Sequence, residues 1–150
     1  MKIMFAIFAL VLGFVVANPA ASYAANPKDQ AFIDSYKKAF ESKDEKTLKS
    51  FLYTKGADPG ALEFYTMMMT SEMGGKITSI ELKPLTPAEI KEATSVQPMP
   101  DGGNAKLPLS PSMKLVLKIG DPSGNSTSTS ESFVAVMDGN YVIPVPAKVQ

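Results

Sequence analysis

Apolar residues recur at helical spacing in the first part of the chain after residue 25. Asn26 can cap a helix that begins at Pro27, because its side-chain oxygen can satisfy the free amide groups of the first turn. The spacing predicts that this helix continues to about Ser42. Its apolar face consists of Phe32, Ile33, Tyr36, Ala39 and Phe40.

A second and shorter helix is predicted directly after the first. Asp44 caps it and Gly56 ends it. The connection is so short that the two helices are expected to pack as an antiparallel hairpin. The predicted buried stripe of the second helix comprises Leu48, Phe51 and Leu52.

The third helix is predicted within Asp58–Gly75, where Asp58 is the cap and Pro59 the first helical residue. At about 100° per residue, apolar side chains cover about half of its circumference. We interpret this arc as an ordinary half-buried face. Met67 lies outside it, and Glu72 lies within it in the last turn. The arc comprises Ala61, Leu62, Phe64, Tyr65, Met68, Met69 and Met73.

From Lys76 onward the period of the pattern changes to two, which is typical of strands. A first strand is predicted to end at Pro84, with Thr78, Ile80 and Leu82 on one face and Ile77 on the other. The clearest strand places Met113, Leu115, Leu117 and Ile119 on one face.

The last two strands are predicted to cover about residues 126–137 and 141–145. Asp138-Gly139-Asn140 joins them as a hairpin turn. Pro144 and Pro146 predict that the final strand lies at a sheet edge, because proline donates no hydrogen bond to a neighbouring strand.

Two segments interrupt the strands. The capping box Thr86–Glu89 predicts a short helix over Pro87–Ala93. Residues 94–111 are rich in Pro, Gly, Ser and Asn, and are predicted to form a long surface loop.

These elements predict an α+β fold, with three N-terminal helices packed on a curved antiparallel sheet of about four strands. The layout resembles the nuclear transport factor 2-like superfamily, and the resemblance implies a cone in which a curved sheet wraps a helix. The hairpin that many members carry between the second and third helices has no room here. The superfamily hosts enzymes, binding modules and assembly domains, so the resemblance implies no single function. The stretches that carry it are Ala31–Asp44, Leu48–Leu52, Lys76–Leu82 and Asp138–Ile143.

Residues 1–24 are predicted to be a signal peptide. Lys2 supplies a positive charge, Ile3–Ala17 is an apolar run, and Ser22-Tyr23-Ala24 fits a cleavage site after Ala24. The apolar run is too short for a good membrane span, and a retained N-terminal anchor is the alternative. We therefore expect an exported protein, periplasmic or secreted. Residues 25–150 would then form a single domain with no membrane span.

Composition excludes several classes of function. The chain has 15 basic and 15 acidic residues, all the basic ones lysine, so it offers no basic stripe for nucleic acid. It contains no cysteine and no histidine, which supply most zinc ligands and the bases of Ser-His and Cys-His catalysis. We expect no disulfide, no metal and no cofactor.

Candidate ligand-binding residues lie on the third helix. Tyr65, Met68, Met69 and Glu72 are predicted to line the wall of the cone, where flexible thioethers adapt to an apolar ligand. Glu72 is also a weak candidate for a general base, because a carboxylate in an apolar pocket is suited to that role. The alternative is that Glu72 simply emerges at the helix end. No partner acid, histidine or arginine that would complete a mechanism is apparent.

Three functions remain open. The favoured one is an exported, non-catalytic domain that binds a small apolar ligand or a protein partner. The second is an isomerase or hydrolase that uses Glu72. The third is a structural or assembly module, for example a homodimer formed through the outer face of the sheet at Lys114, Val116 and Lys118.

Overall fold

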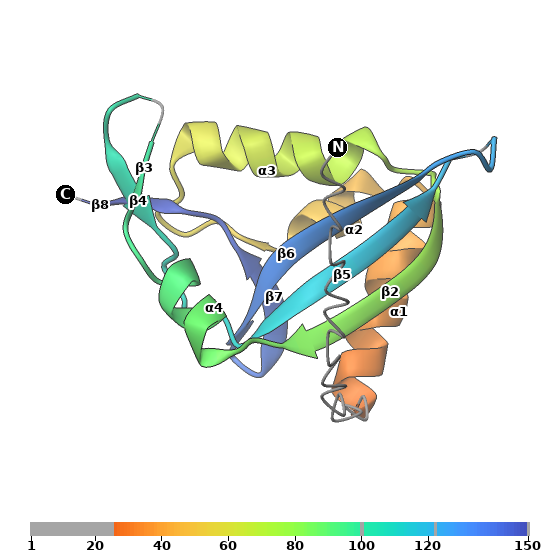
Figure 1. Cartoon of the computed structure of the whole chain (residues 1–150), viewed down its shortest axis with the longest axis horizontal. Coiled ribbons are helices and arrows are strands. Elements are labelled where there is room, and N and C mark those ends of the chain that lie inside the picture. Colours follow the sequence, from red (N-terminus) through yellow and green to blue (C-terminus); the bar gives the residue numbers. More distant parts are fainter. Residues whose placement is uncertain (1–25, 100, 122, 150) are drawn as a thin grey trace, which may run out of the picture.

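The computed structural model describes residues 26–99, 101–121 and 123–149, and the predicted signal peptide lies outside them. This part of the chain has an α+β fold with four helices and two sheets (Figure 1). None of its helices has the length and apolar character needed to cross a membrane. The helices are α1 (Pro27–Glu41), α2 (Glu45–Ser50), α3 (Pro59–Ser71) and α4 (Pro87–Ala93).

The larger sheet has five strands in the order β1-β7-β6-β5-β2. Strand β1 runs parallel to β7, and the other neighbours are antiparallel, so the sheet is mixed rather than purely antiparallel. A second sheet has three antiparallel strands in the order β3-β4-β8. The strands of the larger sheet are β1 (Leu52–Tyr53), β2 (Lys76–Pro84), β5 (Met113–Gly120), β6 (Thr127–Met137) and β7 (Asn140–Pro144); those of the smaller are β3 (Gln97–Pro98), β4 (Asn104–Lys106) and β8 (Ala147–Val149).

Side-chain caps explain why the helices begin where the sequence predicts. The Asn26 side chain accepts hydrogen bonds from the amides of Lys28 and Asp29 at 2.9 and 3.0 Å, and the Asp29 carboxylate accepts one from the Asn26 amide. Thr86 and Glu89 form the same reciprocal box at α4. The predicted capping box of α4 is confirmed, as are its ends.

The main core lies between α1, α3 and one face of the larger sheet. The predicted apolar face of α1 is buried, from Phe32 to Phe40. On β5, the predicted inward set from Met113 to Ile119 is also buried. The face assignments of α1 and β5 are therefore confirmed.

The predicted face of β2 is wrong at its start. A β-bulge between Ile77 and Ser79 adds one residue to β2, so that Ile77 pairs with Ile119 and is buried, while Thr78 is exposed. A strict period of two cannot anticipate a bulge, because the extra residue reverses the alternation at that point.

The second helix is shorter than predicted. It ends at Ser50, and Leu52 belongs to β1, where it pairs with Ile143 of β7. The amide of Ile143 donates to the Phe51 carbonyl at 2.7 Å. Leu48 and Leu52 are both buried, as predicted, but Leu52 is buried from a strand, and Gly56 lies in a later turn.

Strand β7 is not at a sheet edge, contrary to the prediction from its prolines. It lies between β6 and β1, and the amides of Ile143 and Val145 donate to the β1 side. The missing amide of Pro144 therefore falls on the β6 side, beyond the last β6–β7 pair at Val142. The predicted turn between these strands is confirmed, since Asp138 and Gly139 both have positive φ.

Residues 94–111 are not the uniform loop that the sequence predicts. They contain β3 and β4, which pair with each other. Strand β4 also pairs with β8, which follows the last strand of the larger sheet in the sequence. The last described residues of the chain therefore lie beside the Pro- and Gly-rich segment (Figure 1).

An ion pair joins α4 to the outer face of the larger sheet, and it predicts an acid-sensitive contribution to stability. The Lys114 ammonium lies 2.7 Å from Glu89, and this contact, with the amide and hydroxyl of Thr86, holds the pKa of Glu89 at about 2. The pKa is depressed on folding, so this contribution is present above the ordinary glutamate pKa and is lost as the pH falls toward 2. Glu89→Gln should lower the melting temperature at pH 7, and the difference should shrink as the pH falls through the ordinary glutamate pKa toward 2.

The control is Glu92→Gln, on the same helix, for which the described residues show no ion pair. The effect of Glu92→Gln on the melting temperature should not change as the pH falls from the ordinary glutamate pKa toward 2. An equal, pH-independent loss in both variants would contradict the assignment.

Candidate functional site

Helix α3 turns much of its apolar surface to solvent. Only Ala61 and Met69 of this helix are buried, whereas Phe64, Met67 and Met68 are 52%, 56% and 41% exposed. The predicted half-buried face is therefore wrong for Phe64 and Met68. The apolar arc is wider than the part of α3 that packs on the sheet. Apolar character alone did not show which residues of the arc would be buried.

The four predicted ligand-binding residues do come together. Tyr65, Met68, Met69 and Glu72 line one crevice between α3 and the inner face of the sheet. The crevice has a volume of about 20 Å³, which is room for about one water molecule. This crevice is therefore filled by side chains and has no room for a small-molecule ligand. The other lining residues include Tyr36, Phe40, Leu117, Ile119, Ser130, Ser132 and Ile143.

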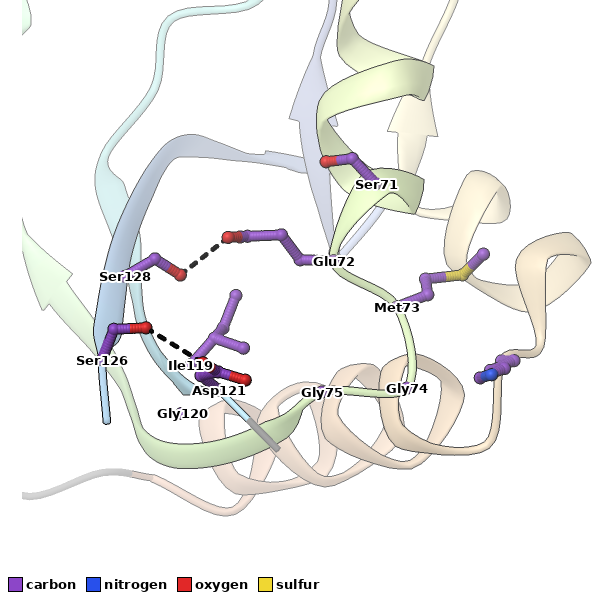
Figure 2. A pocket seen from close by; sticks show the side chains of 11 residues that line it. Ser71, Glu72, Met73, Gly74, Gly75, Ile119, Gly120, Asp121, Ser126 and Ser128 are labelled. Atoms are coloured by element: carbon purple, nitrogen blue, oxygen red, sulfur yellow. Dashed lines mark hydrogen bonds between the residues drawn. The ribbon is translucent and has the colours of Figure 1, made fainter. Parts of the chain in front are cut away.

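Glu72 lies at the end of α3 beside a polar cleft of about 390 Å³ (Figure 2). The hydroxyl of Ser128 on β6 donates to Oε1 of Glu72 at 2.7 Å, which ties the helix end to the sheet. Asp121 and Ser126 lie across the cleft in Figure 2. Lys43 also lines this cleft.

At this cleft the Glu72 carboxylate accepts a hydrogen bond from the Ser128 hydroxyl. Among residues 26–99, 101–121 and 123–149, no three acidic side chains gather where they could hold a metal ion. Glu72 is best described as a link between α3 and β6, while the enzyme hypothesis stays a prediction.

A larger apolar pocket lies at the other end of α3. It has a volume of about 610 Å³, which is within the usual range for small-molecule sites. Phe64 and Tyr65 provide its aromatic surface, and Met99 approaches from the turn after β3. The remaining lining residues are Asp58, Pro59, Gly60, Ala61, Asp101, Pro146 and Lys148.

A second pocket adjoins this one beneath the three-stranded sheet. It has a volume of about 240 Å³ and shares Tyr65, Met99 and Pro146 with the larger pocket. Tyr65 therefore borders the closed crevice and both open pockets. Burial raises the pKa of Tyr65, so its hydroxyl stays protonated and can donate a hydrogen bond near neutral pH.

Of the four predicted residues, only Tyr65 lines the large apolar pocket; Met68, Met69 and Glu72 do not. Sequence reasoning missed Met99, Asp101, Pro146 and Lys148. Their segments meet because β3, β4 and β8 pair and because the Asp58 amide donates to the Pro146 carbonyl at 2.9 Å. The sequence carried no signal for that pairing, since each strand is only two or three residues long.

Comparisons with protein-family models, with curated proteins and with solved structures found no match. What bears on function is therefore the chemistry of the residues themselves.

The outer face of the larger sheet, predicted as a surface for self-association, carries charge. Lys114 pairs with Glu89 at 2.7 Å and lies 3.8 Å from Glu131, and Lys83 pairs with Glu81 at 2.9 Å. Val116 is buried among these side chains, with 8% of its surface exposed. Assembly through this face stays a prediction.

Proposed function

We propose that this chain is an exported, non-catalytic domain that binds a small apolar ligand in the pocket between the first half of α3 and the three-stranded sheet. One observation carries the proposal. The pocket is about 610 Å³ in volume, and apolar side chains make most of its walls. Burying apolar ligand surface against such walls provides the driving force for binding.

We also propose the cone-like arrangement of the nuclear transport factor 2-like superfamily, which the sequence resembles. Support comes from the closed crevice, where α1 and α3 face the same side of the sheet. In this proposal the interior of the cone is filled, and the ligand site lies at its open end, beside Tyr65.

A protein partner is the second candidate, because Phe64, Met67 and Met68 form an exposed apolar strip on α3. Phe64 belongs to both the strip and the pocket, whereas Met67 belongs only to the strip. Substitutions at these two positions can therefore separate the candidates.

Phe64→Ala is expected to weaken binding of an apolar ligand by roughly tenfold, because the ligand loses the apolar surface of the ring. Met67→Ala should leave that affinity unchanged. Native mass spectrometry of the purified protein would show whether an apolar molecule is retained, and titration calorimetry would measure the affinities.

If both variants bound the apolar ligand more weakly, the ligand would lie on the exposed strip and not in the pocket. Unchanged affinity in Phe64→Ala would contradict a ligand site in the pocket.

A further inference from the structure

Three charged side chains line the large apolar pocket, and they come from distant parts of the chain. The Lys148 ammonium lies 3.4 Å from Oδ2 of Asp58 and 2.9 Å from Oδ2 of Asp101. The Oδ1 atoms of these carboxylates accept backbone amides, from Ala61 at 3.0 Å and Gly103 at 3.1 Å. The side chains of Lys148 and Asp101 are 56% and 52% exposed, so these two lie where the pocket meets solvent, whereas Asp58 is 5% exposed.

The sign of the charge at this opening is negative. Two carboxylates face one ammonium, and no other charged side chain of the described residues lines the pocket. The contact with Lys148 lowers the pKa of Asp101, and the contact with Asp101 raises the pKa of Lys148, so both groups stay charged near neutral pH. An anionic head group would meet two carboxylates and only a paired ammonium. A cationic head group would meet uncompensated negative charge.

Aromatic rings add a second feature that favours a cation. Phe64 and Tyr65 line the same pocket, with ring centroids 6.4 Å apart and an interplanar angle of 73°. The faces of aromatic rings attract ammonium and quaternary ammonium groups. Phe64 is 52% exposed, so its ring is accessible to such a group.

We infer that the ligand of this pocket is a cationic amphiphile. Its apolar body lies against Pro59, Ala61 and Met99, and its amine or quaternary ammonium head lies at the opening, near Asp58 and Asp101. The inference rests on the proposed ligand-binding function and adds the chemical class of the ligand. Charge complementarity favours the cationic head group of the ligand, and the apolar walls of the pocket favour its apolar body.

The test compares three probes that share a dodecyl chain and differ in charge: dodecyltrimethylammonium, dodecyl maltoside and dodecyl sulfate. Each is titrated below its micelle concentration into the purified protein and followed by calorimetry. The ammonium probe is expected to bind roughly fivefold more tightly than the neutral one, with the sulfate weakest. The preference should shrink in high salt, because the charges at the opening are exposed.

Two variants should move this preference in opposite directions. Asp101→Asn removes a negative charge from the opening and should reduce the preference for the ammonium probe, while Lys148→Gln removes the positive charge and should increase it. Asp121→Asn is the matched control, because it removes the same charge at the polar cleft near Glu72. Asp121→Asn should leave the preference for the ammonium probe unchanged.

Different outcomes would overturn the ligand class and the ligand-binding function. If the three probes bind equally, or the sulfate binds best, the cationic ligand class is overturned while the apolar site stands. If no probe binds below its micelle concentration, the proposed function itself fails. If Asp121→Asn acts like Asp101→Asn, the effect reflects net charge rather than the pocket, and this too overturns the inference.

Discussion

Phe40→Ala is expected to lower the free energy of unfolding by about 3–5 kcal/mol, which is the usual cost of removing a buried aromatic side chain. Phe40 lies on the buried face of α1 and is 2% exposed. Its ring stacks on Tyr36, with centroids 6.5 Å apart. The residue also fixes the backbone nearby, since its carbonyl accepts the Gly74 amide at 2.9 Å. Urea unfolding, with the slope compared between variants, measures the change.

Phe64→Ala is the matched control for this prediction, because it removes the same side chain from an exposed position. Phe64 is 52% exposed, and the change in stability should stay within about 0.5 kcal/mol. A loss as large as that of Phe40→Ala would show that α3 packs through its Phe64 face. The exposed strip would then not exist, and the pocket would have a different wall.

Gly75→Ala is expected to destabilise the fold by about 1–3 kcal/mol, the usual cost of forcing extra atoms into a packed site. A Cβ at this position would lie 2.8 Å from Cγ2 of Ile119 and 3.0 Å from the carbonyl oxygen of Glu72. Ile119 is a buried residue of β5 and the carbonyl is backbone, so neither can move aside cheaply. The close approach is what lets the chain pass from α3 into β2. Thermal and urea unfolding measure the effect.

Gly103→Ala is its control. There the nearest atom to an added Cβ is Oδ1 of Asp101 at 3.3 Å, which accepts the Gly103 amide and belongs to an exposed side chain that can shift slightly. A loss of about 0.5 kcal/mol or less is expected. If Gly75→Ala proved equally mild, the end of α3 would have to lie farther from β5 than the structure places it.

The helices could be predicted from the sequence because their signals are local. Asn26 with Pro27, and Thr86 with Glu89, act within one turn of the helices that they begin. A cap satisfies amide groups that lie beside it in the chain, so no distant partner is needed. The β6–β7 hairpin is local in the same sense, since Asp138 and Gly139 supply the positive φ angles that its turn requires.

The alternation of inward and outward side chains on β5 could be predicted for a different reason. Its inward side chains are uniformly apolar, so the period of two is unbroken from Met113 to Ile119. The alternation failed on β2, where the bulge before Ser79 has no local apolar signature. On β7 the prediction of a sheet edge from its prolines failed, because Pro144 lies beyond the last pair with β6.

The candidate site was predicted only in part. The sequence indicated that α3 carries the apolar surface and that Tyr65 lies on it, and both hold in the structure. It could not indicate which part of the arc is covered, because that depends on where the sheet lies. Phe64 and Met69 are equally apolar in the chain, yet one is exposed and the other buried.

The sequence by itself determined the helix boundaries set by caps, the turn between β6 and β7, the inward face of β5 and the absence of histidine and cysteine chemistry. Only the tertiary structure decided that the crevice beside Tyr65, Met68, Met69 and Glu72 is filled and that a large apolar pocket lies between α3 and the three-stranded sheet. The physical reason is the separation in sequence between the groups that interact. Caps and turns satisfy groups a few residues apart, whereas the pocket exists because Asp58, Asp101 and Lys148 meet through pairings that only the folded chain forms.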